Sequence, residues 1–307
     1  MDNVYYVENC QEAVSVRGTK YLSFVLNNGE VKVNGNAFGI KAEASVYLHR
    51  VIMCNLKKSG EFVNVENIVI LGGLEALPNE HPILKLNLKS NITPEQACEY
   101  LKNLASKYMT EPYIKLLHYM QIESLFKLYY KFPAGLSIHH NIEGGLLQHV
   151  IEILKLYEGL IQSPQVKNLN HNYVILAVCF HDWGKCMEYD NKKWAVTEDY
   201  SLLGHIYMSA RAVEELIDSF NEENGNLISE VDKKCIIHCI LAHHGQLEWG
   251  SPVVPCIPEA YMVHMCDNMS ARLYQFSHAN HMEKDRYLNN AVVIKPEMLK
   301  SEEIKSV

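Results

Sequence analysis

The spacing of apolar residues changes near residue 90, and this change constrains the fold more than any other feature of the sequence. Before it, apolar residues gather in short runs rich in aromatic and β-branched side chains, such as residues 21–26 and 62–71, and turn-forming residues separate these runs. Short runs of this kind are typical of strands. After it, apolar residues recur every three or four positions over long stretches, which is typical of helices with one buried face. The sequence therefore predicts a β part followed by a helical part.

The β part covers residues 1–72. It contains several short stretches of strand type, and the turn-forming Asn27-Asn28-Gly29 predicts a hairpin between two of them. Further strands are expected at residues 44–53 and 62–71, separated by a turn at residues 57–60. Four or five short strands in about seventy residues favour a small barrel, and an OB-like barrel is the leading hypothesis. A β-domain that serves only packing or oligomer contacts is the alternative.

The helical part follows a linker with glycine and proline turns at residues 73–92. Thr93 is placed to cap the first helix, and Pro94 favours its first position. Residues 93–285 are expected to form one helical domain, and residues 286–307 a C-terminal extension. The predicted helices lie at residues 94–108, 111–131, 144–162, 171–182, 200–221, 230–244 and 258–275. The predicted fold class is mainly α, with a small N-terminal OB-like β-barrel followed by an all-helical domain.

Composition argues against several classes of protein. The net charge of −8 opposes a protein that neutralises many phosphates of duplex DNA. The longest apolar run, residues 174–180, is far shorter than a membrane-spanning helix, and the first residues lack the basic and apolar segments of a secretory signal. The nine cysteines include no Cys-x-x-Cys pair, which disfavours a disulfide framework or a cysteine-based zinc site. We therefore expect a cytoplasmic protein without a membrane partner.

Histidines are numerous and clustered, since ten of the fifteen lie between residues 139 and 264. Such clustering is a first indication of metal binding. The strongest signal is His181-Asp182, which follows the apolar run 174–180. A carboxylate at the end of a buried helix must be paired or bound to a metal, because an isolated buried charge is very costly. Together the two residues offer nitrogen and oxygen ligands to one ion.

Other helices also carry a ligand-type residue on an otherwise apolar face. His149 and His205 lie early in predicted helices, His243-His244 closes another, and Asp267 lies inside the last one. A single histidine of this kind is commonly a hydrogen-bonded core residue. Ligand-type residues on five separate helices instead favour a shared metal centre.

The order His149, His181-Asp182, Asp267 resembles the pattern that gives the HD superfamily of metal-dependent phosphohydrolases its name. His205 and His243-His244 resemble the extended arrangement of its multi-metal members. Within that superfamily, six segments are similar to the YhaM family of 3′→5′ exoribonucleases, which carries an N-terminal OB-fold before its HD domain. These segments are residues 137–140, 144–149, 181–185, 203–205, 243–252 and 267–272.

The resemblance implies a set of metal ligands around one or two divalent ions. The implied ligands of the first ion are His149, His181, Asp182 and Asp267. The implied second ion would share Asp182 and be completed by His205 and His243, with His244 as a further ligand or a phosphate contact. Imidazole and carboxylate ligands suit Mn²⁺, Fe²⁺, Co²⁺, Ni²⁺ or Zn²⁺ better than Mg²⁺. The habit of the family favours Mn²⁺.

The resemblance also implies residues that act on the substrate. Asp182 and Lys185 are expected to be catalytic, with the Lys185 ammonium stabilising the substrate phosphate or the transition state. His139, His140 and Arg272 are further candidates for substrate contact. Each could instead be structural, because a lysine after a helix end or an arginine on a helix commonly lies at the surface.

Three functions remain open as hypotheses. The first is a metal-dependent 3′→5′ exoribonuclease acting on single-stranded RNA or short oligonucleotides. The second is an HD phosphohydrolase acting on a small nucleotide or a cyclic nucleotide. The third is a catalytically inactive protein whose metal site is structural or senses a nucleotide, although the complete set of ligand-type residues argues against it. The sequence also leaves a homo-oligomer open.

The charge of the expected barrel bears on the choice between RNA and a small nucleotide. Surfaces that bind single strands combine positive charge with exposed aromatic rings. Residues 1–72 contain seven basic and seven acidic side chains, so they have no positive excess. The aromatic residues that could stack on bases, or else form the barrel core, are Tyr21, Phe24, Phe38, Tyr47 and Phe62.

Overall fold

The computed structural model describes residues 3–60, 62–73, 76–78, 81–85, 89–135, 139–190, 195–279, 284–285, 288–289 and 291–296. Two compact units make up the chain: Leu88–Tyr274 is one, and Met1–Asn87 together with Gln275–Val307 is the other. The boundary at residue 88 lies inside the expected linker, and the expected extension 286–307 lies mostly outside the described residues. In the described part of the chain, no helix combines the length and apolar character needed to cross a membrane.

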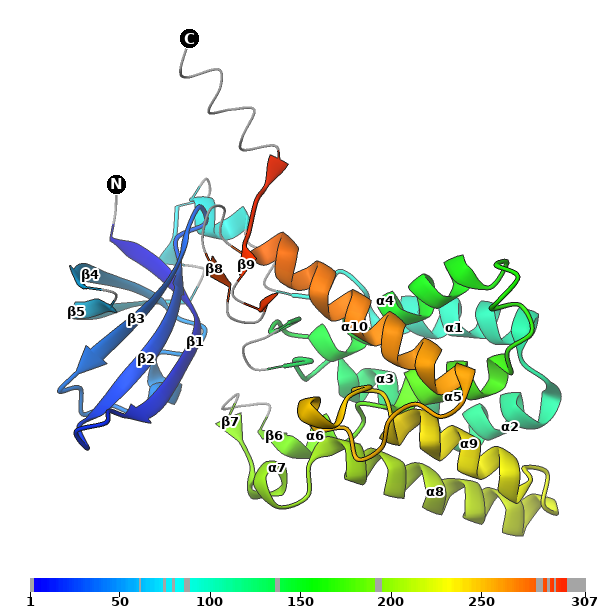
Figure 1. Ribbon diagram of the computed structural model, residues 1–307. Helices are drawn as coiled ribbons and strands as arrows, with labels where there is room; N and C mark the ends of the chain where they lie inside the picture. Colours follow the sequence, from blue (N-terminus) through cyan, green and yellow to red (C-terminus); the bar gives the residue numbers. More distant parts are fainter. Residues whose placement is uncertain are drawn as a thin grey trace. The chain divides into compact units, whose positions relative to one another are not determined.

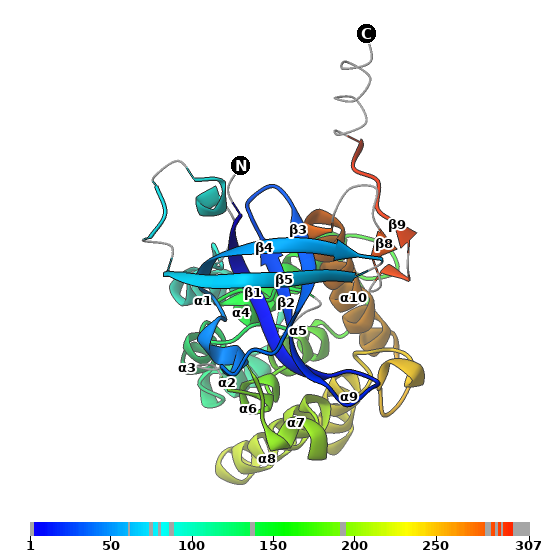
Figure 2. The same cartoon turned by 90° about the vertical axis from the view of Figure 1, so that its left-hand side faces the viewer.

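The first unit contains a closed barrel of five strands: β1 (Val4–Val14), β2 (Lys20–Asn27), β3 (Lys32–Phe38), β4 (Val51–Ser59) and β5 (Phe62–Gly72). The strands follow the order β1-β2-β3-β5-β4 (Figure 2). The β3–β5 pair is parallel and the other neighbours are antiparallel. This five-stranded closed arrangement confirms the predicted OB-like barrel. Two short strands near the C-terminus, β8 (Lys284–Asp285) and β9 (Ala291–Val292), form a separate pair.

The local elements of the barrel differ from the prediction at two places. The expected hairpin is confirmed, because Asn27 pairs with Lys32 across the turn. The expected strand 44–53 is wrong in its first half, since Ala44–Val46 forms a 3-10 turn. The expected turn 57–60 is also wrong, because residues 57–59 pair with β5. Polar residues are compatible with a strand where their side chains face solvent, as residues 57–59 do in β4.

The predicted stacking candidates divide between the core and the surface of the barrel. Phe24 is fully buried and Tyr47 nearly so, and their rings meet edge to face. Phe38 and Phe62 are instead 52% and 65% exposed. The ring of Tyr21 lies 5.0 Å from that of Phe38. Aromatic side chains therefore serve both the core and the outer surface of this barrel.

The second unit is built from helices. They are α1 (Pro94–Tyr108), α2 (Glu111–Tyr119), α3 (Ile122–Tyr129), α4 (Gly145–Leu160), α5 (His171–Phe180), α6 (Lys185–Glu188), α7 (Glu198–Leu202), α8 (His205–Asn224), α9 (Glu230–Leu241) and α10 (Pro258–His278), the last of which ends in the other unit. Thr93 caps α1 and forms a reciprocal pair with Gln96, as its position predicted. The short strands β6 (Tyr189–Asp190) and β7 (Ala195–Val196) pair with each other.

Two of the expected helices are each divided in two. The stretch 111–131 forms α2 and α3, with Gln121 between them in the left-handed conformation at φ 51°. Apolar periodicity continues through this break, so local sequence did not reveal it. The stretch 200–221 is divided between α7 and α8 at Gly204, whose φ of 76° suits glycine.

Helix α5 lies at the centre of the helical unit. Every residue from Asn172 to Phe180 is buried. The helix packs against α1, α4 and α9 (Figure 1). An apolar helix buried all round is a core element. The residues that follow α5 therefore lie inside the unit, and these are His181 and Asp182.

Candidate metal centre

The carboxylate of Asp182 lies at the centre of the histidine cluster. Its Oδ2 is 3.2 Å from Nε2 of His181 and 3.9 Å from Nε2 of His149. Its Oδ1 is 3.5 Å from Nε2 of His205 and 3.7 Å from Nε2 of His243. The two oxygens therefore face two different pairs of imidazoles. Asp267 completes the first side, with its Oδ1 2.9 Å from Nε2 of His149.

Four ligand-type atoms at this centre are buried without a hydrogen-bond partner among the described residues. They are Oδ1 of Asp182 and Nε2 of His181, His205 and His243. Buried polar atoms are almost always paired, so four orphaned atoms around one point require an explanation. A divalent ion supplies one, because imidazole nitrogen and carboxylate oxygen are ligands of transition metals. The residues present therefore fit a divalent metal.

The other nitrogen of each orphaned imidazole is already engaged. Nδ1 of His181 donates to the carbonyl of Val178 at 2.9 Å. Nδ1 of His243 donates to the carbonyl of Ile240 at 2.6 Å. A proton fixed on Nδ1 leaves the electron pair on Nε2, which points to the centre. Such second hydrogen bonds are the usual support of metal-binding histidines.

Burial and charge set the protonation of the cluster. Burial alone would raise the pKa of Asp182, but the Lys185 ammonium, with Nζ 2.7 Å from Oδ2, and then His181 hold it well below the usual range. Burial would likewise raise the pKa of Asp267, but the hydrogen bond and the charge of His149 lower it below its usual range. Burial lowers the pKa of His243. Ionised carboxylates and neutral imidazoles are the forms that bind metal ions.

Lys185 and His181 respond to the same carboxylate. Burial would lower the pKa of both groups, but the charge of Asp182 raises the pKa of each above its ordinary value. Lys185 is nearly buried, and its ammonium holds Oδ2 of Asp182 in a charge-assisted hydrogen bond. A metal ion and this ammonium would compete for the same oxygen.

Glu188 holds His205 in place, and sequence reasoning missed it. This buried carboxylate accepts hydrogen bonds from both the backbone N–H and Nδ1 of His205, the latter at 3.1 Å. It thus satisfies the first N–H of α8 and leaves Nε2 of His205 facing Asp182. Glu188 lies one turn after Lys185 on α6, but nothing local in the sequence links it to a histidine seventeen residues away.

Gly184 allows the loop after Asp182 to lie against the start of α8. Its N–H donates to Oγ of Ser209 at 2.8 Å. A Cβ added at Gly184 would lie 2.4 Å from the carbonyl oxygen of His205 and 2.6 Å from its Cα. The absence of a side chain here therefore brings His205 beside Asp182.

We expect Gly184→Ala to destabilise the protein and to weaken the binding of divalent ions. The added methyl group must push back the backbone of His205, and overpacking of this kind costs about 1–3 kcal/mol. Thermal unfolding and calorimetric titration with Mn²⁺ measure the two effects. Gly159→Ala in α4 is the matched control, because a Cβ there meets nothing within 4 Å. The control should be neutral or stabilised by up to about 1 kcal/mol, and an equal effect of both substitutions would contradict the steric argument.

The turn that follows α9 contributes His243 and His244, because the helix ends at Leu241 and not at residue 244 as expected. With His205, their ligand atoms lie within 4.8 Å of one another. Nδ1 of His244 donates to the carbonyl of Trp249 at 2.8 Å. Gly245 follows with a φ of 78°, and a Cβ there would lie 2.3 Å from the ring of His264. The ring of His264 thus packs against Gly245 and has a structural role in this loop.

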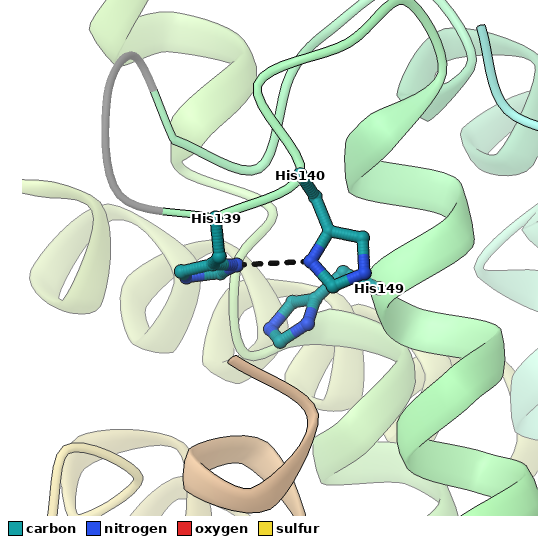
Figure 3. Close-up of side chains that lie close together, drawn as sticks. All are labelled: His139, His140 and His149. Carbon is teal, nitrogen blue, oxygen red and sulfur yellow. Dashed lines mark hydrogen bonds between the residues drawn. The ribbon is translucent and has the colours of Figure 1, made fainter. Parts of the chain in front are cut away.

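His139 and His140 precede α4 in the chain, and their rings lie beside that of His149 (Figure 3). The ring of His139 is 4.6 Å from that of His149, and the ring of His140 is 5.1 Å from it. The two preceding residues of the predicted motif, 137 and 138, lie outside the described residues. Arg272 lies on α10 beyond Asp267, with its guanidinium 6.0 Å from the ring of Trp249.

The structure thus brings most of the predicted residues together. The ligand-type atoms that lie within 4.8 Å of others in a group come from His139, His140, His149, His181, Asp182, His205, His243, His244 and Asp267. Lys185 joins them through Asp182. Arg272 contacts Trp249 and Asn268 instead.

Comparison with known proteins adds a family to this geometry. Residues 146–272 match the model of the HD domain, and all seven proposed metal ligands lie in that range. A 3'-5' exoribonuclease YhaM from Geobacillus sp. (strain WCH70) is 28% identical over 172 residues, which are 56% of this chain and 51% of that protein. The chain therefore spans about half the length of this relative. No solved structure matches this chain. Residues 146–272 are therefore similar to an HD domain, and the chain is similar to a 3'-5' exoribonuclease YhaM over about half of its length.

Proposed function

We propose that this protein is a metal-dependent phosphodiesterase that shortens single-stranded RNA or short oligonucleotides from the 3′ end. The observation that carries the hydrolytic part is the set of four orphaned ligand atoms around Asp182. The name of the Geobacillus relative supports the choice of RNA and of the 3′ end. The alternative, a phosphohydrolase of small or cyclic nucleotides, uses the same centre.

The proposed centre holds two divalent ions, and Mn²⁺ is the proposed metal. Asp182 would share its oxygens between them, because Oδ2 faces His149 and His181 whereas Oδ1 faces His205 and His243. Asp267 would complete the first site and His244 the second. When bound, such ions supply Lewis acidity, which lowers the pKa of water towards neutrality and neutralises charge on phosphoryl oxygens.

The remaining residues of the centre would bind and orient the substrate. The Lys185 ammonium, whose Nζ lies 2.7 Å from Oδ2 of Asp182, would stabilise the substrate phosphate or the transition state. His139 and His140 lie beside His149 and are proposed to contact the same phosphate or its neighbour. Arg272 stays a proposal for a more distant phosphate, since its guanidinium now lies over Trp249.

The barrel offers features that suit a base rather than a phosphate. A cavity of about 520 Å³ is lined by Asn36, Phe38, Tyr47, Asn64 and neighbouring residues of β3 and β5. Phe38 presents an exposed ring for stacking, and the amides of Asn36 and Asn64 can donate and accept hydrogen bonds. These features support a single strand as the partner of the barrel.

Short single-stranded RNA labelled at its 5′ end tests the proposed function. With Mn²⁺, we expect a ladder of labelled products that shorten by one nucleotide at a time, and a 3′ label should appear at once as a mononucleotide. A chelator should stop the reaction, and added Mn²⁺ should restore it. Turnover confined to mononucleotides or cyclic nucleotides would establish the alternative. Absence of turnover with Mn²⁺, Fe²⁺, Co²⁺, Ni²⁺ and Zn²⁺ would contradict both.

A further inference from the structure

Glu152 lies one turn after His149 on α4, and hydrogen bonds connect it with several histidines near the centre. Its Oε2 accepts hydrogen bonds from Nε2 of His140 at 2.8 Å and from Oγ of Ser270 at 3.2 Å. Its Oε1 accepts one from Nε2 of Gln148 at 2.8 Å. Burial would raise the pKa of Glu152, but the hydrogen bond from His140 and its other partners lower it to about 2. An ionised carboxylate can only accept, so all three partners must donate to it.

The hydroxyl of Ser270 lies between Glu152 and His149, so its donation to Glu152 fixes which hydrogen bond it can make with His149. A serine hydroxyl has one hydrogen, and Ser270 donates it to Glu152. Towards Nδ1 of His149, 3.1 Å away, the same oxygen can therefore only accept. His149 must then donate through Nδ1, which leaves Nε2 to face the centre.

Nε2 of His149 faces two carboxylates. It lies 2.9 Å from Oδ1 of Asp267, with which it shares a hydrogen bond, and 3.9 Å from Oδ2 of Asp182. In the absence of metal, a proton on Nε2 serves this hydrogen bond. Without that proton, Nε2 and the two carboxylate oxygens are atoms that would hold a divalent ion. The proton that Ser270 keeps on Nδ1 thus leaves Nε2 as the metal-binding nitrogen.

The carboxylate of Glu152 also acts on His139 through His140. Because His140 donates through Nε2, the Nδ1 of the neutral ring carries an electron pair and accepts from Nδ1 of His139 at 3.1 Å (Figure 3). His140 cannot easily rotate, since it is fully buried and its ring lies 4.0 Å from that of Tyr274. The backbone of His140 is also closely packed, since a Cβ added at Gly145 would lie 1.9 Å from the carbonyl oxygen of His140. His139 therefore presents Nε2 as an electron pair beside His149.

We propose that Glu152 is a positioning residue of the metal centre. Through Ser270 it keeps a proton on Nδ1 of His149, so that Nε2 faces the centre, and through His140 it selects the tautomer of His139. Glu152 touches neither ion nor substrate in this arrangement. The inference rests on the proposed metal-dependent function, but it concerns hydrogen bonds that exist without metal. It makes a glutamate and a serine outside the ligand set determinants of metal affinity.

Calorimetric titration of the full chain with Mn²⁺ alone tests the proposal. Ser270→Ala breaks only the branch to His149, and Ser270→Thr keeps a hydroxyl at the same place. Glu152→Gln leaves one acceptor oxygen for three donors. Since loss of an outer hydrogen-bond partner typically weakens metal binding about 10–100-fold, we expect that loss for Ser270→Ala and Glu152→Gln. We expect Ser270→Thr to stay close to the wild type.

Glu158→Gln is the matched control for removal of the charge. Glu158 lies on the same helix, α4, and it also accepts a side-chain hydrogen bond, from Tyr100 at 2.7 Å. Among the described residues, the hydrogen bonds of Glu158 lead to no histidine of the centre. We expect its Mn²⁺ affinity to equal that of the wild type. An equal loss in this control and in Glu152→Gln would overturn the proposal, because the effect would then follow from charge alone.

Nitrogen-15 NMR of the histidines in the metal-free protein reads the tautomers directly. We expect Nδ1 of His149 to carry a proton in the wild type and in Ser270→Thr. In Ser270→Ala we expect Nε2 alone to carry one, because Asp267 remains its partner. A purely structural role of Glu152 would not change these signals. A wild-type His149 with its proton on Nε2 alone, or a folded Ser270→Ala variant with unchanged protonation and affinity, would overturn the inference and leave the metal centre standing. Wild-type protein that binds no Mn²⁺ would instead overturn the proposed function, while the tautomers would still decide the role of Glu152.

Discussion

Asp182→Asn is expected to lose both the bound metal and the activity. Its two oxygens face both pairs of imidazoles, and an amide keeps the shape of the side chain while removing the charge and one acceptor. Metal ions contribute several kcal/mol to stabilisation of a transition state, so turnover should fall by about 1000-fold or more. Metal analysis of the purified variant and the rate on labelled RNA with saturating Mn²⁺ measure the two losses.

The substitution also leaves the nearly buried Lys185 ammonium without its carboxylate. An uncompensated buried charge costs about 3–5 kcal/mol, so the single variant should be less stable. The double variant Asp182→Asn with Lys185→Met removes that charge, and it should regain stability without regaining turnover. Glu214→Gln, at an exposed position of α8, controls for the loss of a carboxylate and should behave as the wild type. Full turnover by Asp182→Asn would exclude this centre as the active site.

Lys185→Met is expected to separate metal binding from activity. The ammonium now occupies Oδ2 of Asp182 at 2.7 Å, so its removal frees a ligand oxygen, and Mn²⁺ should bind as tightly as in the wild type or more tightly. Turnover should nevertheless fall, because the loss of one group that stabilises developing charge costs about 100–1000-fold. Calorimetric titration with Mn²⁺ and the rate at saturating Mn²⁺ give the two quantities.

Lys233→Met provides a comparison for this second prediction. Lys233 is also largely buried and pairs with carboxylates, those of Asp218 and Glu230, but on α8 and α9. Its replacement should change stability and leave turnover per folded molecule unaltered. If Lys185→Met loses its metal together with its activity, Lys185 supports the ligands rather than the substrate. If turnover is unchanged, Lys185 has no part in the reaction.

Local sequence determined much of this protein. The change in apolar spacing separated barrel from helices, because strands and helices repeat with different periods. Thr93 and Pro94 set the start of α1, since capping depends on adjacent residues only. Ligand-type residues on apolar faces predicted which side chains would meet, because a buried polar group needs a partner wherever it lies.

The tertiary structure alone decided where one predicted helix breaks and which side chains support the centre. The break at Gln121 has no local signal, and packing of α2 and α3 overrides an apolar pattern that runs through both. Glu188 finds His205 across seventeen residues, and Glu152 finds Ser270 across 118. A hydrogen bond depends on distance and direction in space, and neither is written in a local pattern of residue types. Sequence therefore predicted the ligand-type residues of this centre, and only the fold revealed the side chains that hold them in place.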